Sequence, residues 1–199
     1  MGRSEDKQND IISAAIKEFG EKGMIATTME SIACRANVSK RTLYKHYPCK
    51  THLLDVVVNL LLARIAHLKE VQYCPNESLL NQLKHLAYLT IQLSSDQDYI
   101  NLSRIVIIES MRCEEAAQHL NSKFKDCEQG LELWFTQASK AGVLGDYNPT
   151  LAATLFYGGI KKIAYWDQVI WWKPTIKDPE AERLITQTCE LFVNAFSSK

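Results

Sequence analysis

The sequence predicts an all-α protein in which an N-terminal three-helix domain with a helix-turn-helix precedes a larger helical domain, with about nine helices in all. Apolar residues recur at helical spacing along most of the chain, and no stretch shows the sustained apolar–polar alternation of strands. Glycine occurs only eight times in 199 residues, so strong helix breakers are few. We expect the two domains to span residues 1–50 and 51–199.

The first predicted helix covers residues 11–23 and has one apolar face. That face carries Ile11, Ile12, Ala15, Ile16 and Phe19. Gly23 is well suited to end this helix, because glycine adopts the left-handed conformation found just past many helix C-termini.

Residues 27–50 then predict two short helices joined by a tight turn. Thr27 or Thr28 can cap the first of them, with Glu30 as the capping-box partner of Thr27. Asn37 tolerates the left-handed conformation that the turn requires. Ser39 caps the second helix, and Pro48 ends it by restricting the residue before it.

The second of these helices is strongly basic. Residues 33–50 contain five Lys or Arg and no Asp or Glu, and residues 1–50 carry a net charge of +3 against −3 for the remainder. A basic second helix is typical of a helix-turn-helix that enters the DNA major groove. The alternative, a solvated basic helix with no partner, is weakened by the two apolar-faced helices that flank it.

The chain resembles the N-terminal DNA-binding domain of the TetR family of transcriptional regulators over residues 11–54. The matching residues are Ile12, Ala14, Ala15, Phe19, Gly23, Thr28, Ile32, Ala33, Val38, Ser39, Leu43, Tyr44, Tyr47, Lys50 and Leu53. This resemblance implies a homodimer, a helical C-terminal domain for effector binding and dimerisation, and repression that a small apolar or amphipathic effector relieves by releasing a palindromic operator.

The resemblance also implies DNA contacts for nine residues. Phosphate contacts are expected from Thr28, Tyr44, Tyr47 and Lys50, and contacts in the groove from Ser39, Lys40, Arg41, Thr42 and His46.

Three positions depart from the family pattern. Asn37 stands where glycine is usual, Arg41 where a small residue is common, and Cys49 where a Ser or Asn cap is common.

Beyond residue 50 the pattern predicts helices at about 50–72, 77–94, 97–112 and 114–141, and then two helices that begin at prolines, over 148–171 and 178–197. The resemblance implies that the last two form the dimer interface. We assign to it Leu155, Gly159, Ile163, Leu184, Ile185, Thr188 and Leu191. The alternative is that these helices only close the core of a monomer.

All four tryptophans lie within residues 134–172, with Tyr157 nearby, and such a cluster can line an apolar ligand pocket. Ordinary core packing is an equally good interpretation. From the family's cavity position we assign to an effector pocket Leu61, Ile65, Leu86, Ile105, Trp134, Tyr157 and Lys161. The sequence does not identify the effector.

The sequence lacks the usual catalytic motifs, and its five histidines have no metal-ligand spacing, so we expect no catalytic residues, metal or cofactor. Six scattered cysteines without a CxxC pair suggest a reducing compartment. No signal peptide or apolar run of ~20 residues is evident, so we expect a cytoplasmic protein without a membrane segment.

The expected partners are double-stranded operator DNA, a second copy of the chain and an unknown small-molecule effector. The alternative function is a DNA-binding adaptor controlled by a protein partner.

Overall fold

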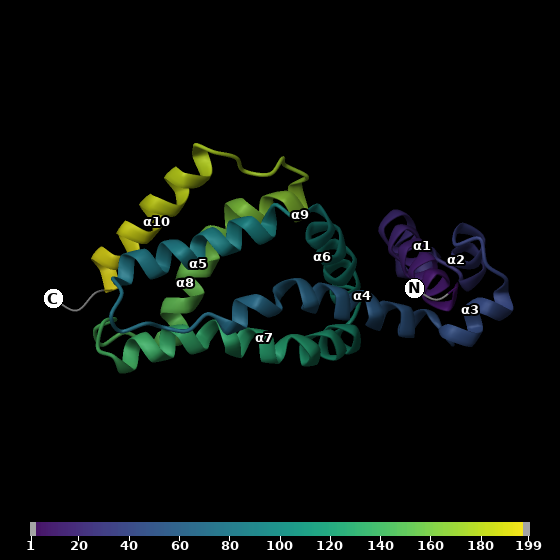
Figure 1. The fold of residues 1–199 in the computed structure, drawn as a ribbon, viewed down its shortest axis with the longest axis horizontal. Helices are drawn as coiled ribbons and strands as arrows, with labels where there is room; N and C mark the ends of the chain where they lie inside the picture. The colour runs from purple at the N-terminus through teal and green to yellow at the C-terminus, as the bar shows by residue number, and fades with distance from the viewer. Residues whose placement is uncertain (1–2, 197–199) are drawn as a thin grey trace. The chain divides into compact units, whose positions relative to one another are not determined.

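The computed structural model describes residues 3–196, and the side chains of all of these except residues 3, 4, 69 and 126–131. The regular structure of the described residues is helical throughout, which confirms the predicted fold class. The chain forms two compact units (Figure 1). The first runs to Ala63 and includes Asn101–Lys123, and the second comprises Arg64–Ile100 and the residues from Phe124 onward.

The helices are labelled in chain order. Their bounds are α1 (Arg3–Ala26), α2 (Met29–Arg35), α3 (Lys40–His46), α4 (Lys50–Ile65), the 3₁₀ helix η1 (Ala66–Glu70), α5 (Leu79–Ser94), α6 (Gln97–Ser110), α7 (Glu114–Lys140), α8 (Pro149–Lys161), the π-helical turn η2 (Lys162–Trp166), α9 (Asp167–Trp171) and α10 (Glu180–Phe196).

In the first unit, α1 packs against α2, and α2 packs against α3 (Figure 1). The apolar face predicted for residues 11–23 supplies the buried side chains of Ile11 and Phe19, and α2 and α3 add Ile32 and Leu43. Removing these side chains from water is the main force that holds the three helices together, since α2 and α3, with seven residues each, are too short to be stable alone.

The turn between α1 and α2 begins at Gly23, whose φ of 76° and ψ of 165° interrupt the helix where the sequence predicted its end. The predicted capping box of Thr27 and Glu30 is wrong. Thr28 is the cap, and its partner is Ser31, which accepts a hydrogen bond from the Thr28 amide. Thr27 is buried instead, and its hydroxyl donates to the carbonyl oxygens of Glu18 and Gly23.

The turn between α2 and α3 and the ends of α3 agree with the prediction. Asn37 has a left-handed φ of 52°, and the Ser39 hydroxyl accepts the amide hydrogen of Thr42. α3 ends at His46, since Tyr47, which precedes Pro48, is extended.

The first unit continues into α4, α6 and the start of α7. Leu53 and Val57 of α4 and Leu102 of α6 are buried there. A polar link joins α4 to α7, because Asp55 Oδ1 lies 3.0 Å from both His119 Nε2 and Lys123 Nζ.

The second unit has an aromatic-rich core. α10 packs on α5 and α8, and α5 also packs on α8 and η2 (Figure 1). The ring centroid of Phe135 lies 4.9 Å from that of Trp134 and 5.7 Å from that of Phe156, so these aromatic side chains form part of a continuous core. Part of the aromatic cluster seen in the sequence is therefore core.

The two proline-initiated helices differ from each other. Asn148 caps α8, with Pro149 in its first turn, as predicted. The second helix was predicted to begin at Pro179, but α10 begins at Glu180.

One stretch, Lys50–Leu68, is long and apolar enough by composition to cross a membrane, with a mean hydropathy of 1.4. Asp55 and Arg64 interrupt this stretch, so it is not an uninterrupted apolar run of ~20 residues. The same test is passed by core helices of soluble proteins. Within this stretch Asp55 pairs with Lys123 and Arg64 with Asp98, so its charged side chains have partners in the protein. The stretch supports no membrane assignment by itself.

Candidate DNA-binding surface and effector pocket

The outer face of α3 is polar and basic. Lys40, Arg41, Tyr44 and Lys45 are exposed, whereas Leu43 is fully buried and anchors the helix. Of the residues predicted to face the groove, Thr42 and His46 are half-buried. Ser39 and Thr42 are joined by a hydrogen bond of 2.8 Å between their hydroxyls. A helix with long cations outside and one apolar anchor inside can contact phosphates and base edges.

Two more of the predicted groove residues have partners within the unit. Lys40 Nζ lies 3.1 Å from a carboxylate oxygen of Glu30, and both side chains are exposed. His46 Nδ1 lies 3.2 Å from the side-chain nitrogen of Gln8 on α1. The exposed Lys40 pair costs little to open in water, so Lys40 stays available to an anion.

The residues predicted to contact phosphates divide into two groups. Tyr44 is 46 % exposed, but Tyr47 is buried, and burial raises the pKa of its phenol. Thr28 caps α2 with its hydroxyl. Lys50 donates hydrogen bonds to the carbonyl oxygens of Thr27 at 2.6 Å, Met24 at 2.7 Å and Ile25 at 3.3 Å. Thr28 and Lys50 therefore hold the first unit together, whatever they contribute to DNA.

A buried carboxylate on α1 was missed by the sequence analysis. Glu18 is buried and accepts hydrogen bonds from Lys22 at 2.8 Å and from Arg35 of α2 at 2.7 Å. Lys22, Ser31 and Arg35 together hold the pKa of Glu18 at about 2, below its ordinary value of 4.5. The spacing of Glu18 and Lys22 is visible in the sequence, but the contact with Arg35 comes only from the crossing of α1 and α2.

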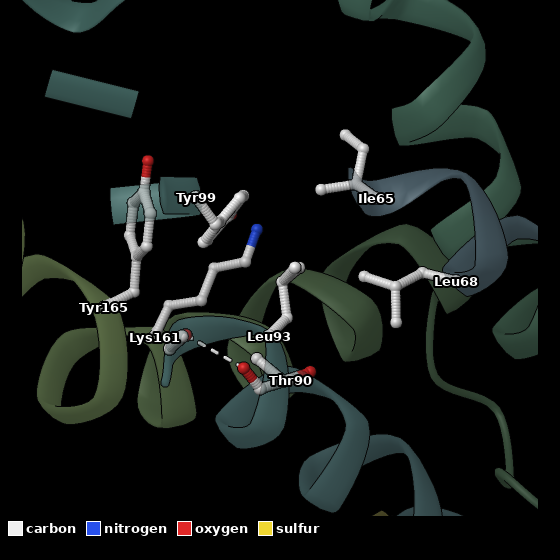
Figure 2. A pocket seen from close by; sticks show the side chains of 8 residues that line it. Ile65, Leu68, Thr90, Leu93, Tyr99, Lys161 and Tyr165 are labelled. Carbon is white, nitrogen blue, oxygen red and sulfur yellow. Dashed lines mark hydrogen bonds between the residues drawn. The ribbon is translucent and has the colours of Figure 1, made fainter. Parts of the chain in front are cut away.

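The second unit contains a small, mostly apolar pocket with a volume of about 50 Å³. Figure 2 shows the lining side chains, which come from α4, η1, α5, α6, α8 and η2. The lining residues are Ile65, Leu68, Thr90, Leu93, Ser94, Tyr99, Lys161 and Tyr165. Ile65 and Lys161 had been assigned to an effector pocket from the sequence, and Tyr99 and Tyr165 had not.

The other residues assigned to the pocket lie elsewhere. Leu61 and Ile105 are buried side chains of the first unit. Leu86 and Tyr157 are buried in the core of the second, where burial raises the pKa of the Tyr157 phenol. Trp134 is also core, and it borders a more polar hollow of about 230 Å³ near residues 71–85. Helical periodicity could not separate core from pocket here, because both need apolar side chains facing inward.

An exposed apolar stripe runs along α8, η2 and α9. It consists of Leu151, Leu155, Ile163, Trp166 and Ile170, whose exposed fractions lie between 37 % and 53 %. Between them Gly159 has open space where a side chain would lie. On α10, Leu191 is 70 % exposed.

The residues assigned to a dimer interface divide accordingly. Leu155, Gly159, Ile163 and Leu191 are exposed, and Leu184 and Thr188 are half-buried. Ile185 is 4 % exposed and packs in the core of its own protomer.

Among the described residues there is no group of three or more His, Cys, Asp or Glu that could hold a metal ion. The described residues offer a basic outer face on α3, an exposed apolar stripe and a pocket, each of which can bind a partner.

Comparisons with known proteins agree with this arrangement. Residues 11–57 match the family described as bacterial regulatory proteins, tetR family, and residues 81–198 match the AefR-like transcriptional repressor, C-terminal domain. A crystal structure of a TetR family transcriptional regulator from Pseudomonas syringae pv. tomato str. DC3000 is 30 % identical, covers 96 % of this chain and 97 % of its own, and superposes with a TM-score of 0.83.

Two further proteins are similar at lower identity. The HTH-type transcriptional repressor KstR2 of Mycobacterium tuberculosis is 24 % identical, over 87 % of this chain and 84 % of its own length. The SmeT–triclosan complex is 20 % identical with a TM-score of 0.72, covers 97 % of this chain and 92 % of its own, and shows the likeness of fold alone. The basic α3, the helical second unit and the matches over both parts of the chain establish that this protein belongs to the TetR family and is a DNA-binding transcriptional repressor.

Proposed function

We propose that the protein represses transcription by binding a palindromic operator as a homodimer, and that a small apolar or amphipathic effector in the pocket of the second unit releases it. One observation carries the proposal, namely that α4 belongs to both units. It begins at Lys50, beside the helix-turn-helix, and ends at Ile65, which lines the pocket.

The DNA-binding part of the proposal rests on α3. We place five residues in the major groove, namely Ser39 at the cap of α3 and Lys40, Arg41, Thr42 and His46 on it. We place Tyr44 at the phosphates. Arg41 is the strongest candidate for reading a base, because a guanidinium can bind guanine through two hydrogen bonds. We assign a mainly structural role to Thr28, Tyr47 and Lys50, which stabilise the first unit so that α3 is exposed to DNA.

The dimer is proposed to form through the apolar stripe on α8, η2 and α9 together with the outer face of α10. Large apolar side chains such as Leu155 and Leu191 are costly to leave in water, and Gly159 lets another helix approach closely. A second copy of the chain is the proposed occupant, since two recognition helices about 34–36 Å apart are needed to read successive turns of one DNA face.

Release is proposed to act through the end of α4. Arg64, next to Ile65, pairs with Asp96 and with Asp98, whose carboxylate oxygen lies 3.2 Å from the guanidinium. Asp98 precedes Tyr99, which also lines the pocket. An effector that displaces Ile65 and Tyr99 thus moves the neighbours of Arg64 and of Asp98. We propose that this disturbs the ion pairs and shifts α4. By thermodynamic linkage, DNA must then weaken effector binding by the same factor.

The small volume of the pocket favours one alternative, a DNA-binding adaptor controlled by a protein partner. In the chain as it stands, about 50 Å³ holds no more than one or two water molecules. The proposed effector must therefore enlarge the pocket, whereas the alternative leaves it closed. In either case the protein acts where DNA is, which we propose to be the cytoplasm.

The test couples two measurements on the same protein. An operator selected from random DNA is bound in a fluorescence-anisotropy assay, and compounds that raise the melting temperature are then added to the complex. We expect stabilising compounds to weaken operator binding by five- to 150-fold, the usual range of allosteric coupling. Compounds that stabilise the protein without changing operator affinity would contradict induction and favour the adaptor.

A further inference from the structure

The first helix of the chain begins well before the part that matches the TetR family model. α1 starts at Arg3, whereas the matched residues are 11–57. The additional turns of α1 include Gln8, whose side chain is half-buried, while its neighbours Lys7 and Asn9 are exposed. The family match therefore assigns no role to Gln8.

The half-buried side chain of Gln8 meets the last residue of the recognition helix. Its Nε2 lies 3.2 Å from Nδ1 of His46, which ends α3 and is itself half-buried. This contact joins α1 directly to the helix that we place in the major groove. On its other side the His46 ring lies near the buried ring of Tyr47, with 6.3 Å between the two centroids.

The chemistry of the two groups decides where the imidazole carries its hydrogen. The nitrogen of a side-chain amide can only donate, so His46 Nδ1 accepts the hydrogen bond from Gln8 with its lone pair. A neutral imidazole has one ring hydrogen, and the hydrogen bond made by one nitrogen sets the state of the other. The hydrogen of His46 therefore lies on Nε2.

Nε2 is the nitrogen that remains available to DNA, because no described residue forms a hydrogen bond with it. An N–H donor at this place suits an acceptor on a base edge. In the major groove guanine presents N7 and O6 as acceptors and thymine presents O4, whereas cytosine presents an amino donor. The state of the ring thus decides which bases His46 can recognise.

We propose that Gln8 is a positioning residue for operator recognition. Its amide N–H fixes His46 as an Nε2–H donor, and His46 then selects a guanine or a thymine in the major groove. The inference rests on the proposed groove contact of His46, since Gln8 acts only through that side chain. It extends the surface that determines specificity to a part of α1 outside the matched residues.

The test reverses the hydrogen bond with a change that keeps the shape of the side chain. Gln8→Glu replaces the amide donor by a carboxylate, which can only accept. In mildly alkaline buffer, where histidine is neutral, His46 Nδ1 must then carry the hydrogen, and Nε2 becomes an acceptor. Asn9→Asp is the matched control, because it adds the same charge at the next position, which is exposed.

The first measurement needs no DNA. NMR chemical shifts of the imidazole nitrogens show which nitrogen of His46 carries the hydrogen, and circular dichroism shows that each full-length variant is folded. We expect the hydrogen on Nε2 in wild type and in Asn9→Asp, and on Nδ1 in Gln8→Glu. A hydrogen on Nδ1 in wild type, or the same state in Gln8→Glu and Asn9→Asp, would overturn the role of Gln8.

The second measurement is the base preference of each protein, obtained by selecting operators from random DNA. His46→Ala identifies the base pair at which His46 matters. At that base pair Gln8→Glu should lose the preference for guanine or thymine by about three- to ten-fold relative to Asn9→Asp, which is the worth of one hydrogen bond.

The two measurements separate failure of this inference from failure of the proposed function. If His46→Ala selects the same bases as wild type, the groove contact of His46 is wrong, whereas the effect of Gln8 on the ring stands or falls with the NMR result. If His46→Ala changes the preference but Gln8→Glu does not, the groove contact stands and the positioning role of Gln8 is refuted.

Discussion

The ammonium nitrogen of Lys50 lies 2.6 Å from the carbonyl oxygen of Thr27, and it also bonds the carbonyl of Met24. These carbonyls belong to the segment that ends α1 and leads into α2, whereas Lys50 is the first residue of α4. One side chain therefore ties the helix-turn-helix to the helix that continues to the pocket. A lysine expected from the sequence to touch phosphate has a structural task that the sequence did not reveal.

Replacement of Lys50 by Met should lower the melting temperature of the protein, because two well-formed carbonyl contacts lose their charged donor at a cost of about 1–3 kcal/mol. Operator affinity should fall with it. The salt dependence of binding separates the two roles. An unchanged slope of log K against log salt indicates a structural lysine, and a slope smaller by about one unit indicates a lost phosphate contact.

Replacement of Arg41 by Ala should relax discrimination at particular operator base pairs by about 1–3 kcal/mol if its contact is bidentate. The fold should be unaffected, because Arg41 is exposed on α3. Competition assays with single-base operator variants measure this. Lys140→Ala, at the exposed end of α7, is the control. Wild-type discrimination by the Arg41 variant would remove Arg41 from the base-reading surface.

The stability of the first unit should fall in acid because of Glu18. The pKa of Glu18 is about 2 in the folded protein against an ordinary 4.5, so the folded state favours the ionised form. This contribution is fully present above about pH 4.5 and is lost as the pH falls from there toward 2. Urea unfolding of wild type and Glu18→Gln should therefore differ at pH 6, on the order of 2 kcal/mol, and converge near pH 2. A difference that stays constant with pH would contradict the assignment.

Replacement of Leu191 by Asp should convert the dimer to a folded monomer. Leu191 is 70 % exposed in the protomer, so the introduced aspartate carboxylate would remain in water and leave the fold of the protomer intact. In the proposed interface the same carboxylate would be buried without a partner, at a cost of several kcal/mol. Light scattering gives the mass, and circular dichroism confirms the fold. Tyr88→Asp, which changes an exposed apolar residue of α5, should remain a dimer. The same change at Ile185 is less informative, because it would disrupt the core of the protomer itself.

Much of the local structure of the helix-turn-helix could be predicted from nearby sequence. The cap at Ser39, the left-handed turn at Asn37 and the end of α3 before Pro48 each depend on residues close in the chain, and the structure agrees at all three. The apolar periodicity of residues 11–23 likewise identified the face that is buried. These features follow from short-range sterics and hydrogen bonding between neighbouring residues, and those residues can be read from the sequence.

Contacts between distant residues were decided only by the tertiary structure. The sequence could not indicate that Lys50 would reach the Thr27 carbonyl, that Arg35 would meet Glu18, or that Tyr99 and Lys161 would line one pocket while Trp134 and Tyr157 packed in the core. Inward-facing apolar positions look alike at helical spacing. Whether such a position fills a core, lines a pocket or covers a partner depends on which helices cross over it.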